Sequence, residues 1–236
     1  MSGSPTIPLG PVLAAVLVLA ALGAPARGQD SATTSGPAAY FDPADLQARP
    51  MTGCGVQPRP GSPLAVSGMA VVPDSVARSN AEVWRTAGEP SLYAASRQPG
   101  RSNLRTFRLT WTPSFDPWMV VRLEEQSADR FVVTATRAPP PQSERAGAAN
   151  QDKLRRPLTD AQNAAFVQAL AQARLADLPA PDNCTPPGYD GPGWALESLT
   201  SAGYRFRFER SPQGGALRDL GELMLDFTGW PTRSRY

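Results

Sequence analysis

Two acidic residues in the C-terminal part of the chain, Asp190 and Glu197, come closest to a recognisable chemical arrangement. A pair of carboxyl groups can cleave a glycosidic bond, with one as the general acid and the other as the nucleophile or base. Tyr189 and Trp194 flank this pair, and their ring faces are suited to stacking on a sugar. The segment therefore fits a carboxylate-dependent glycan-active enzyme, or a module that binds a glycan or peptide through Tyr189 and Trp194.

A structural role explains the same residues more simply. Asp190 is followed by glycine, and Asp-Gly is a common turn in which the Asp side chain accepts backbone N–H bonds. Glu197 can pair across a hairpin with Arg207, and Trp194 is a residue type that usually belongs to a core. We therefore predict structural roles for Glu197 and Arg207 and no catalytic residue. Tyr189, Asp190 and Trp194 remain candidate binding residues.

The composition excludes several kinds of chemistry. The chain has no histidine and only two cysteines, which removes histidine-based nucleophilic and acid–base catalysis and histidine-bound zinc or haem. Two cysteines without histidine do not complete a tetrahedral metal site. No glycine-rich loop links a strand to a helix in the manner of a phosphate-binding motif. We therefore expect no metal, no cofactor and no enzyme activity.

The elements around Glu197 are predicted to form a β-hairpin. Residues 194–200 and 204–210 have strand length, and Gly203 lies between them. Glycine adopts positive φ without a steric penalty, so we predict that Gly203 is left-handed and ends a three-residue loop.

The register of this hairpin is predicted from the sorting of its faces. A two-residue turn pairs Leu199 with Tyr204 and mixes apolar and charged residues on both faces. A three-residue loop pairs Thr200 with Tyr204 and places Glu197 opposite Arg207, which separates the two kinds of residue. Because a slip of one residue exchanges the faces of a whole strand, we predict the second register.

A closing helix follows the hairpin. Leu217, Leu220, Met224 and Phe227 recur at helical spacing, and their apolar stripe is expected to pack on the aromatic face of the hairpin.

A set of motifs runs through the last part of the chain. It comprises Asp190-Gly-x-x-Trp194-x-Leu196-Glu197, Tyr204, Arg210-x-Pro212 and the Leu-rich closing helix, with Phe107 to Trp111 and the helix that ends at Leu178-Pro179 further upstream. This pattern resembles an uncharacterised family of small exported bacterial proteins over roughly the last 130 residues. The resemblance implies no activity.

The middle of the chain predicts three strands and a helix. Residues 104–112, 118–123 and 131–136 have strand patterns, and the first alternates apolar residues with Arg108 and Thr110. A helix over 158–178 follows, opened by a capping box at Thr159 to Gln162, and residues 74–88 also fit a helix. The expected fold is α+β: an antiparallel sheet of about five strands in the order βββαββα, with two or three helices on one face.

The N-terminal residues predict export. Residues 1–28 have the apolar core and small residues of a signal peptide, with cleavage near Ala26 to Gly28 and no transmembrane anchor in the mature chain. Residues 29–50 are expected to form a flexible leader. A single domain then covers 51–236, of which 101–236 is the best-defined part.

The compartment bears on the two cysteines. In an exported chain Cys54 and Cys184 are expected to form a disulfide, with two unpaired buried thiols as the alternative.

The expected role is an exported, soluble, non-enzymatic accessory or binding protein of the bacterial envelope whose partner the sequence does not indicate. Nucleic acid is not an expected partner, because the net charge is only +2 and the basic residues are not clustered.

Overall fold

The computed structural model describes residues 36–49, 69–100, 103–114, 116–139, 151–175 and 191–232. All of them belong to one unit that spans residues 34–236. The predicted signal peptide and both cysteines, Cys54 and Cys184, lie outside the described residues. Export and the disulfide therefore remain predictions.

A six-stranded sheet, in which every neighbouring pair is antiparallel, organises the fold. The α+β class is confirmed, with one strand more than expected. The sheet order is β6-β5-β4-β3-β7-β8. The strands are β3 (Thr106–Thr112), β4 (Trp118–Ser127), β5 (Arg130–Ala138), β6 (Asp152–Pro157), β7 (Gly193–Thr200) and β8 (Gly203–Arg210), and a separate pair consists of β1 (Ala48–Arg49) and β2 (Met69–Ala70).

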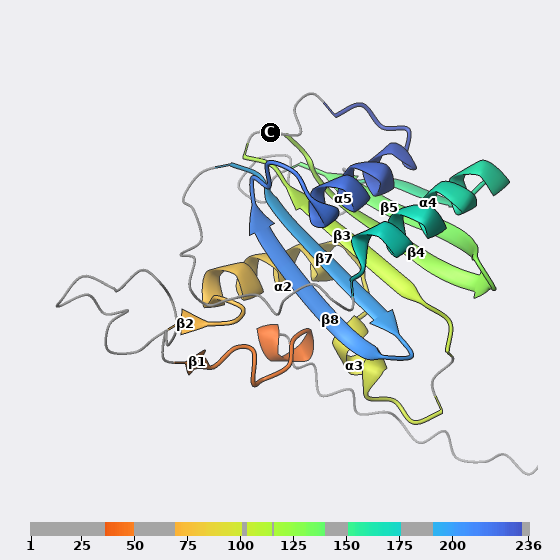
Figure 1. The fold of residues 1–236 in the computed structure, drawn as a ribbon. Helices are drawn as coiled ribbons and strands as arrows, with labels where there is room; N and C mark the ends of the chain where they lie inside the picture. Colours follow the sequence, from red (N-terminus) through yellow and green to blue (C-terminus); the bar gives the residue numbers. More distant parts are fainter. Residues whose placement is uncertain are drawn as a thin grey trace, which may run out of the picture. The chain divides into compact units, whose positions relative to one another are not determined.

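Two helices cover one face of this sheet, α4 (Asp160–Ala173) and α5 (Ala216–Asp226) (Figure 1). The capping box that was predicted for α4 is present: Thr159 and Gln162 each bond the other's backbone N–H. α5 packs closely on β7, because a Cβ atom on Gly221 would lie 2.8 Å from the ring of Trp194. The core on this side joins Phe107, Leu109, Trp111, Phe131, Val133, Phe166, Trp194, Leu220 and Met224.

The opposite face of the sheet is also covered, which differs from the prediction that the helices share one face. α2 (Asp74–Ala87) lies there, with α3 (Leu92–Ser96) and the short 3-10 helix η1 (Pro37–Ala39) nearby (Figure 1). Phe41 and Trp84 pack there with their ring centroids 5.3 Å apart. Phe41 is only 1% exposed, and Tyr40 and Leu46 pack against the same cluster, so these residues of the predicted leader lie against the domain.

The hairpin of β7 and β8 has the register that the sequence analysis rejected. Leu199 pairs with Tyr204, so Glu197 lies opposite Phe206 and Arg207 lies opposite Leu196. Gly203 does have positive φ, 106°. The face-sorting argument failed because it assumed that water covers one face of the hairpin. In the structure, α5 packs on the β7 side of one face, and α3 packs against the other face together with Trp84 of α2 and Phe41.

Candidate functional site

Of the three predicted binding residues, only Trp194 lies within the described part of the chain. Tyr189 and Asp190 lie outside it. Trp194 is 0% exposed and packs against Trp111 with a centroid separation of 6.3 Å. A buried ring offers no face to a ligand. A glycan- or peptide-binding platform that uses the Trp194 side chain is therefore ruled out.

Glu197 is also fully buried, and its partner is not Arg207. It forms an ion pair with Arg108, its register partner on β3, and its Oε1 accepts a hydrogen bond of 3.0 Å from the Tyr204 hydroxyl. Arg207 instead pairs with Glu209 at 2.9 Å. A carboxylate sealed in this way cannot reach a glycosidic bond, so Glu197 is not available to a glycan-active enzyme.

Arg108 is the centre of a buried charged cluster on the α2 side of the sheet. Its Nη1 donates to the carbonyl oxygen of Pro90 at 2.7 Å and lies 3.5 Å from Glu89. Its guanidinium lies 4.2 Å from the ring centroid of Trp84. Arg122 on β4 lies 2.8 Å from the same Glu89 carboxylate. The cluster therefore ties β3, β4 and β7 to the connection between α2 and α3.

Burial governs the electrostatics of this cluster. It raises the pKa of the Glu197 carboxyl, and the charge and hydrogen bonds of Arg108 oppose that rise. Burial, together with the Glu197 carboxylate, raises the pKa of Tyr204 well above its usual value. Tyr204 therefore remains a neutral hydrogen-bond donor, and the cluster holds its elements together rather than presenting a reactive group.

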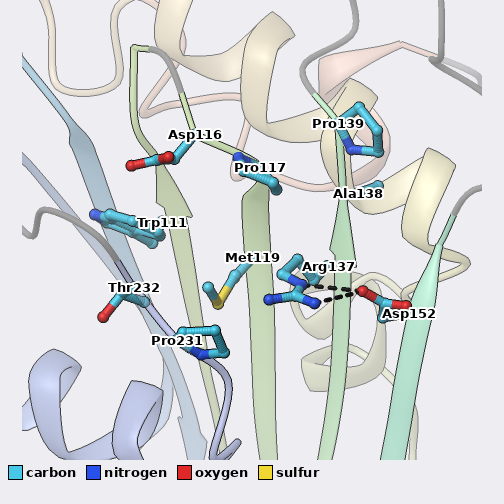
Figure 2. A pocket seen from close by; sticks show the side chains of 10 residues that line it. All are labelled: Trp111, Asp116, Pro117, Met119, Arg137, Ala138, Pro139, Asp152, Pro231 and Thr232. Carbon is cyan, nitrogen blue, oxygen red and sulfur yellow. Dashed lines mark hydrogen bonds and ion pairs between the residues drawn. The ribbon is translucent and has the colours of Figure 1, made fainter.

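A cavity of about 510 Å³ opens on the other side of the sheet, at one end of β3, β4, β5 and β6. Its floor is a single cross-strand row, because Trp111 pairs with Met119, Met119 with Arg137 and Arg137 with Asp152. The antiparallel meander brings these residues together from positions that are up to 41 apart in the sequence. The complete lining, shown in Figure 2, is Trp111, Asp116, Pro117, Met119, Arg137, Ala138, Pro139, Asp152, Pro231 and Thr232.

Arg137 is the main polar group of the cavity. Its Nε and Nη2 donate to Asp152 Oδ2 at 3.1 and 2.7 Å. Its guanidinium also lies 5.1 Å from the ring centroid of Trp230, which follows α5. These contacts hold the side chain in one orientation.

Two further polar groups in the lining have no partner among the described residues. The Trp111 Nε1 atom is buried without a hydrogen-bond acceptor there. Asp116, between β3 and β4, forms no ion pair with any residue that the structure describes. The cavity thus combines an apolar wall with one carboxylate, that of Asp116, that has no ion-pair partner among the described residues.

The sequence analysis missed both arrangements for the same reason. Arg108 was assigned to a polar face of its strand, and alternation cannot reveal that residues 74–87 cover that face. The sequence places Asp116, Arg137 and Asp152 far apart from one another and in no common motif. Only the register of the sheet brings them together.

Within the described ranges, no group of three or more Asp, Glu, Cys or His side chains could hold a metal ion. The helices described there are all too short or too polar to cross a membrane.

Comparisons of the chain with protein-family models, with curated proteins and with solved structures found no match.

Proposed function

We propose that this protein is exported and acts by binding a small molecule in the cavity at the end of β3 to β6, without catalysing a reaction. The observation that carries the proposal is the cavity itself, whose volume of about 510 Å³ lies in the range typical of small-molecule sites, roughly 300 to 1,000 Å³. Such sites combine mainly apolar walls with a few placed polar groups. The prolines supply exposed apolar walls above the buried Met119 and Trp111, and Arg137 and Asp116 supply the polar groups.

Two observations support binding over catalysis. The chain has no histidine, and the buried carboxylate of Glu197 is committed to Arg108 and Tyr204. The apolar segment at residues 12–22 supports export, which would place this binding role in the bacterial envelope.

A fragment screen by ligand-observed NMR tests the proposal. Compounds that bind the full chain are expected to lose binding to Thr232→Trp, because a large ring at this lining position fills the cavity. Gln213→Trp is the matched control, since Gln213 is exposed and does not line the cavity. Binding that is equally strong in both variants, or a complete absence of binding compounds, would contradict the proposed function.

A further inference from the structure

We infer that the cavity binds a small zwitterion, an amino acid or a short peptide, whose carboxylate bonds to Arg137 and whose ammonium group pairs with Asp116. This inference rests on the proposed function and adds the chemical class of the ligand.

Arg137 has one donor left for a ligand. Nε and Nη2 both bond to Asp152, and no described residue accepts a bond from Nη1. Figure 2 shows this remaining nitrogen turned away from Asp152, on the side of Met119 and Pro231. Hydrogen bonds between guanidinium and carboxylate are among the stronger ones in proteins. Because Asp152 and Trp230 already fix the guanidinium, a ligand carboxylate would bind without first ordering it.

Asp116 supplies the complementary charge. Figure 2 shows it across the cavity from Arg137, on the side of Trp111. Its carboxylate pairs with no cation in the described part of the chain. A ligand ammonium group that reaches this position would gain the ion pair that the protein does not provide.

The charge of the lining selects a zwitterion over a simple anion. One arginine, Arg137, lies among two aspartates, Asp116 and Asp152, so the lining carries a net negative charge. A ligand with only a carboxylate would be repelled by Asp116, whereas a ligand with only an amine would leave Nη1 of Arg137 unused. A molecule with both groups satisfies both ends of the cavity.

The surface between the two charged groups is apolar and rigid. Trp111 and Met119, both almost fully buried, lie beneath this surface, and the more exposed Pro117, Pro139 and Pro231 stand around it. Because this surface is apolar, the body of the ligand is expected to be apolar too. Proline side chains lose little conformational freedom when a ligand covers them, so this contact costs little entropy.

Calorimetry with three related probes tests the ligand class on the full chain. Leucyl-leucine carries both charges, its N-acetyl form lacks the ammonium group, and its C-terminal amide lacks the carboxylate. We expect leucyl-leucine to bind at least about tenfold more tightly than either blocked form, since each blocked form loses one charge-assisted contact. Equal affinities for the three probes would overturn the inference.

Two variants assign the contacts. Arg137→Gln is expected to remove the preference for leucyl-leucine over its C-terminal amide. Asp116→Asn is expected to remove the preference for leucyl-leucine over its N-acetyl form. Asp116→Asn breaks no contact of the described structure, so its outcome does not depend on altered folding. Arg97→Gln and Asp219→Asn, at exposed positions outside the cavity, are the matched controls. A preference over the N-acetyl form that survives in Asp116→Asn would contradict the inference.

The two proposals can fail separately. In one outcome, fragments bind the wild type but not Thr232→Trp, and leucyl-leucine binds no better than its blocked forms. This outcome would overturn the ligand class but would not contradict the proposed binding function. If no compound binds at all, both are overturned.

Discussion

The sheet contains two arginine–carboxylate pairs that each join neighbouring strands, one in a buried environment and one in a partly exposed environment. Arg108 faces Glu197 across β3 and β7, and Arg137 faces Asp152 across β5 and β6, each as register partners. The first pair is fully buried, whereas the side chains of the second are 24% and 61% exposed. The sealed pair joins elements of the fold, whereas the open pair leaves Nη1 of Arg137 without an acceptor among the described residues.

The largest effect is expected from breaking the sealed pair. Glu197→Ala removes the direct partner of the buried Arg108 and leaves only the Glu89 carboxylate, which Arg108 shares with Arg122. We expect this to lower the free energy of unfolding by about 3 to 5 kcal/mol. Urea denaturation followed by tryptophan fluorescence measures this change. The double substitution Arg108→Met with Glu197→Leu is the control, because it removes both charges and is expected to recover much of the loss. A loss below about 1 kcal/mol, the value of an exposed pair, would contradict the structural role of this cluster.

A third pair, Arg105 with Glu125, lies between these extremes and responds to pH. The Glu125 carboxylate accepts two hydrogen bonds from the Arg105 side chain, one from the Arg105 backbone N–H and one from the Asp129 backbone N–H. The contacts with Arg105 and Asp129 lower the pKa of Glu125 to about 2. Because the folded pKa lies below the unfolded value, this stabilisation is present above about pH 4.5 and is lost as the pH falls toward 2. We expect Glu125→Gln to lower the free energy of unfolding by up to about 3 kcal/mol at pH 7, less to the extent that solvent screens Arg105.

Denaturation of wild type and Glu125→Gln between pH 2 and pH 7 measures this effect. The two stability curves should converge as the pH approaches 2. Parallel curves over this range would show that Glu125 does not titrate with the low pKa assigned to it.

The smallest effect is expected from the open pair. Asp152→Ala removes the partner of Arg137, but both side chains reach solvent, so the free energy of unfolding should fall by less than about 1 kcal/mol. Urea denaturation alongside Glu197→Ala provides the comparison. A loss as large as that of Glu197→Ala would show that exposure does not separate the two pairs.

Local patterns predicted the elements that depend on near neighbours. The capping box at Thr159 and Gln162 identified the start of α4, and the spacing of Leu217, Leu220 and Met224 identified the buried side of α5. Both signals lie within a few residues of the structure that they predict. α4 ends at Ala173, earlier than the predicted limit at residue 178.

Features that depend on distant segments were not predictable in the same way. The hairpin register depends on the elements that pack on both of its faces. One of these elements is α2, which lies more than 100 residues upstream of β7 in the sequence. Strand β6 was missed because Leu154 is its only strongly apolar residue. It forms as an edge strand by pairing its backbone with β5. The cavity requires the register of four strands together.

The central contrast, between a sealed cluster and an open cavity, can be observed at the tryptophans. The chain has five. Trp111 lines the cavity and Trp230 packs on Arg137, whereas Trp84 packs on Arg108 and donates its indole N–H to Thr110 at 2.6 Å.

The most direct test is a titration of the full chain, labelled at the indole nitrogens, with leucyl-leucine or a fragment from the screen. Single substitutions of each tryptophan by phenylalanine assign the indole signals. The signals of Trp111 and Trp230 are expected to shift to saturation while that of Trp84 stays in place. A shift of Trp84 with no change at Trp111 would contradict the account, because it would place the ligand on the cluster that the structure seals.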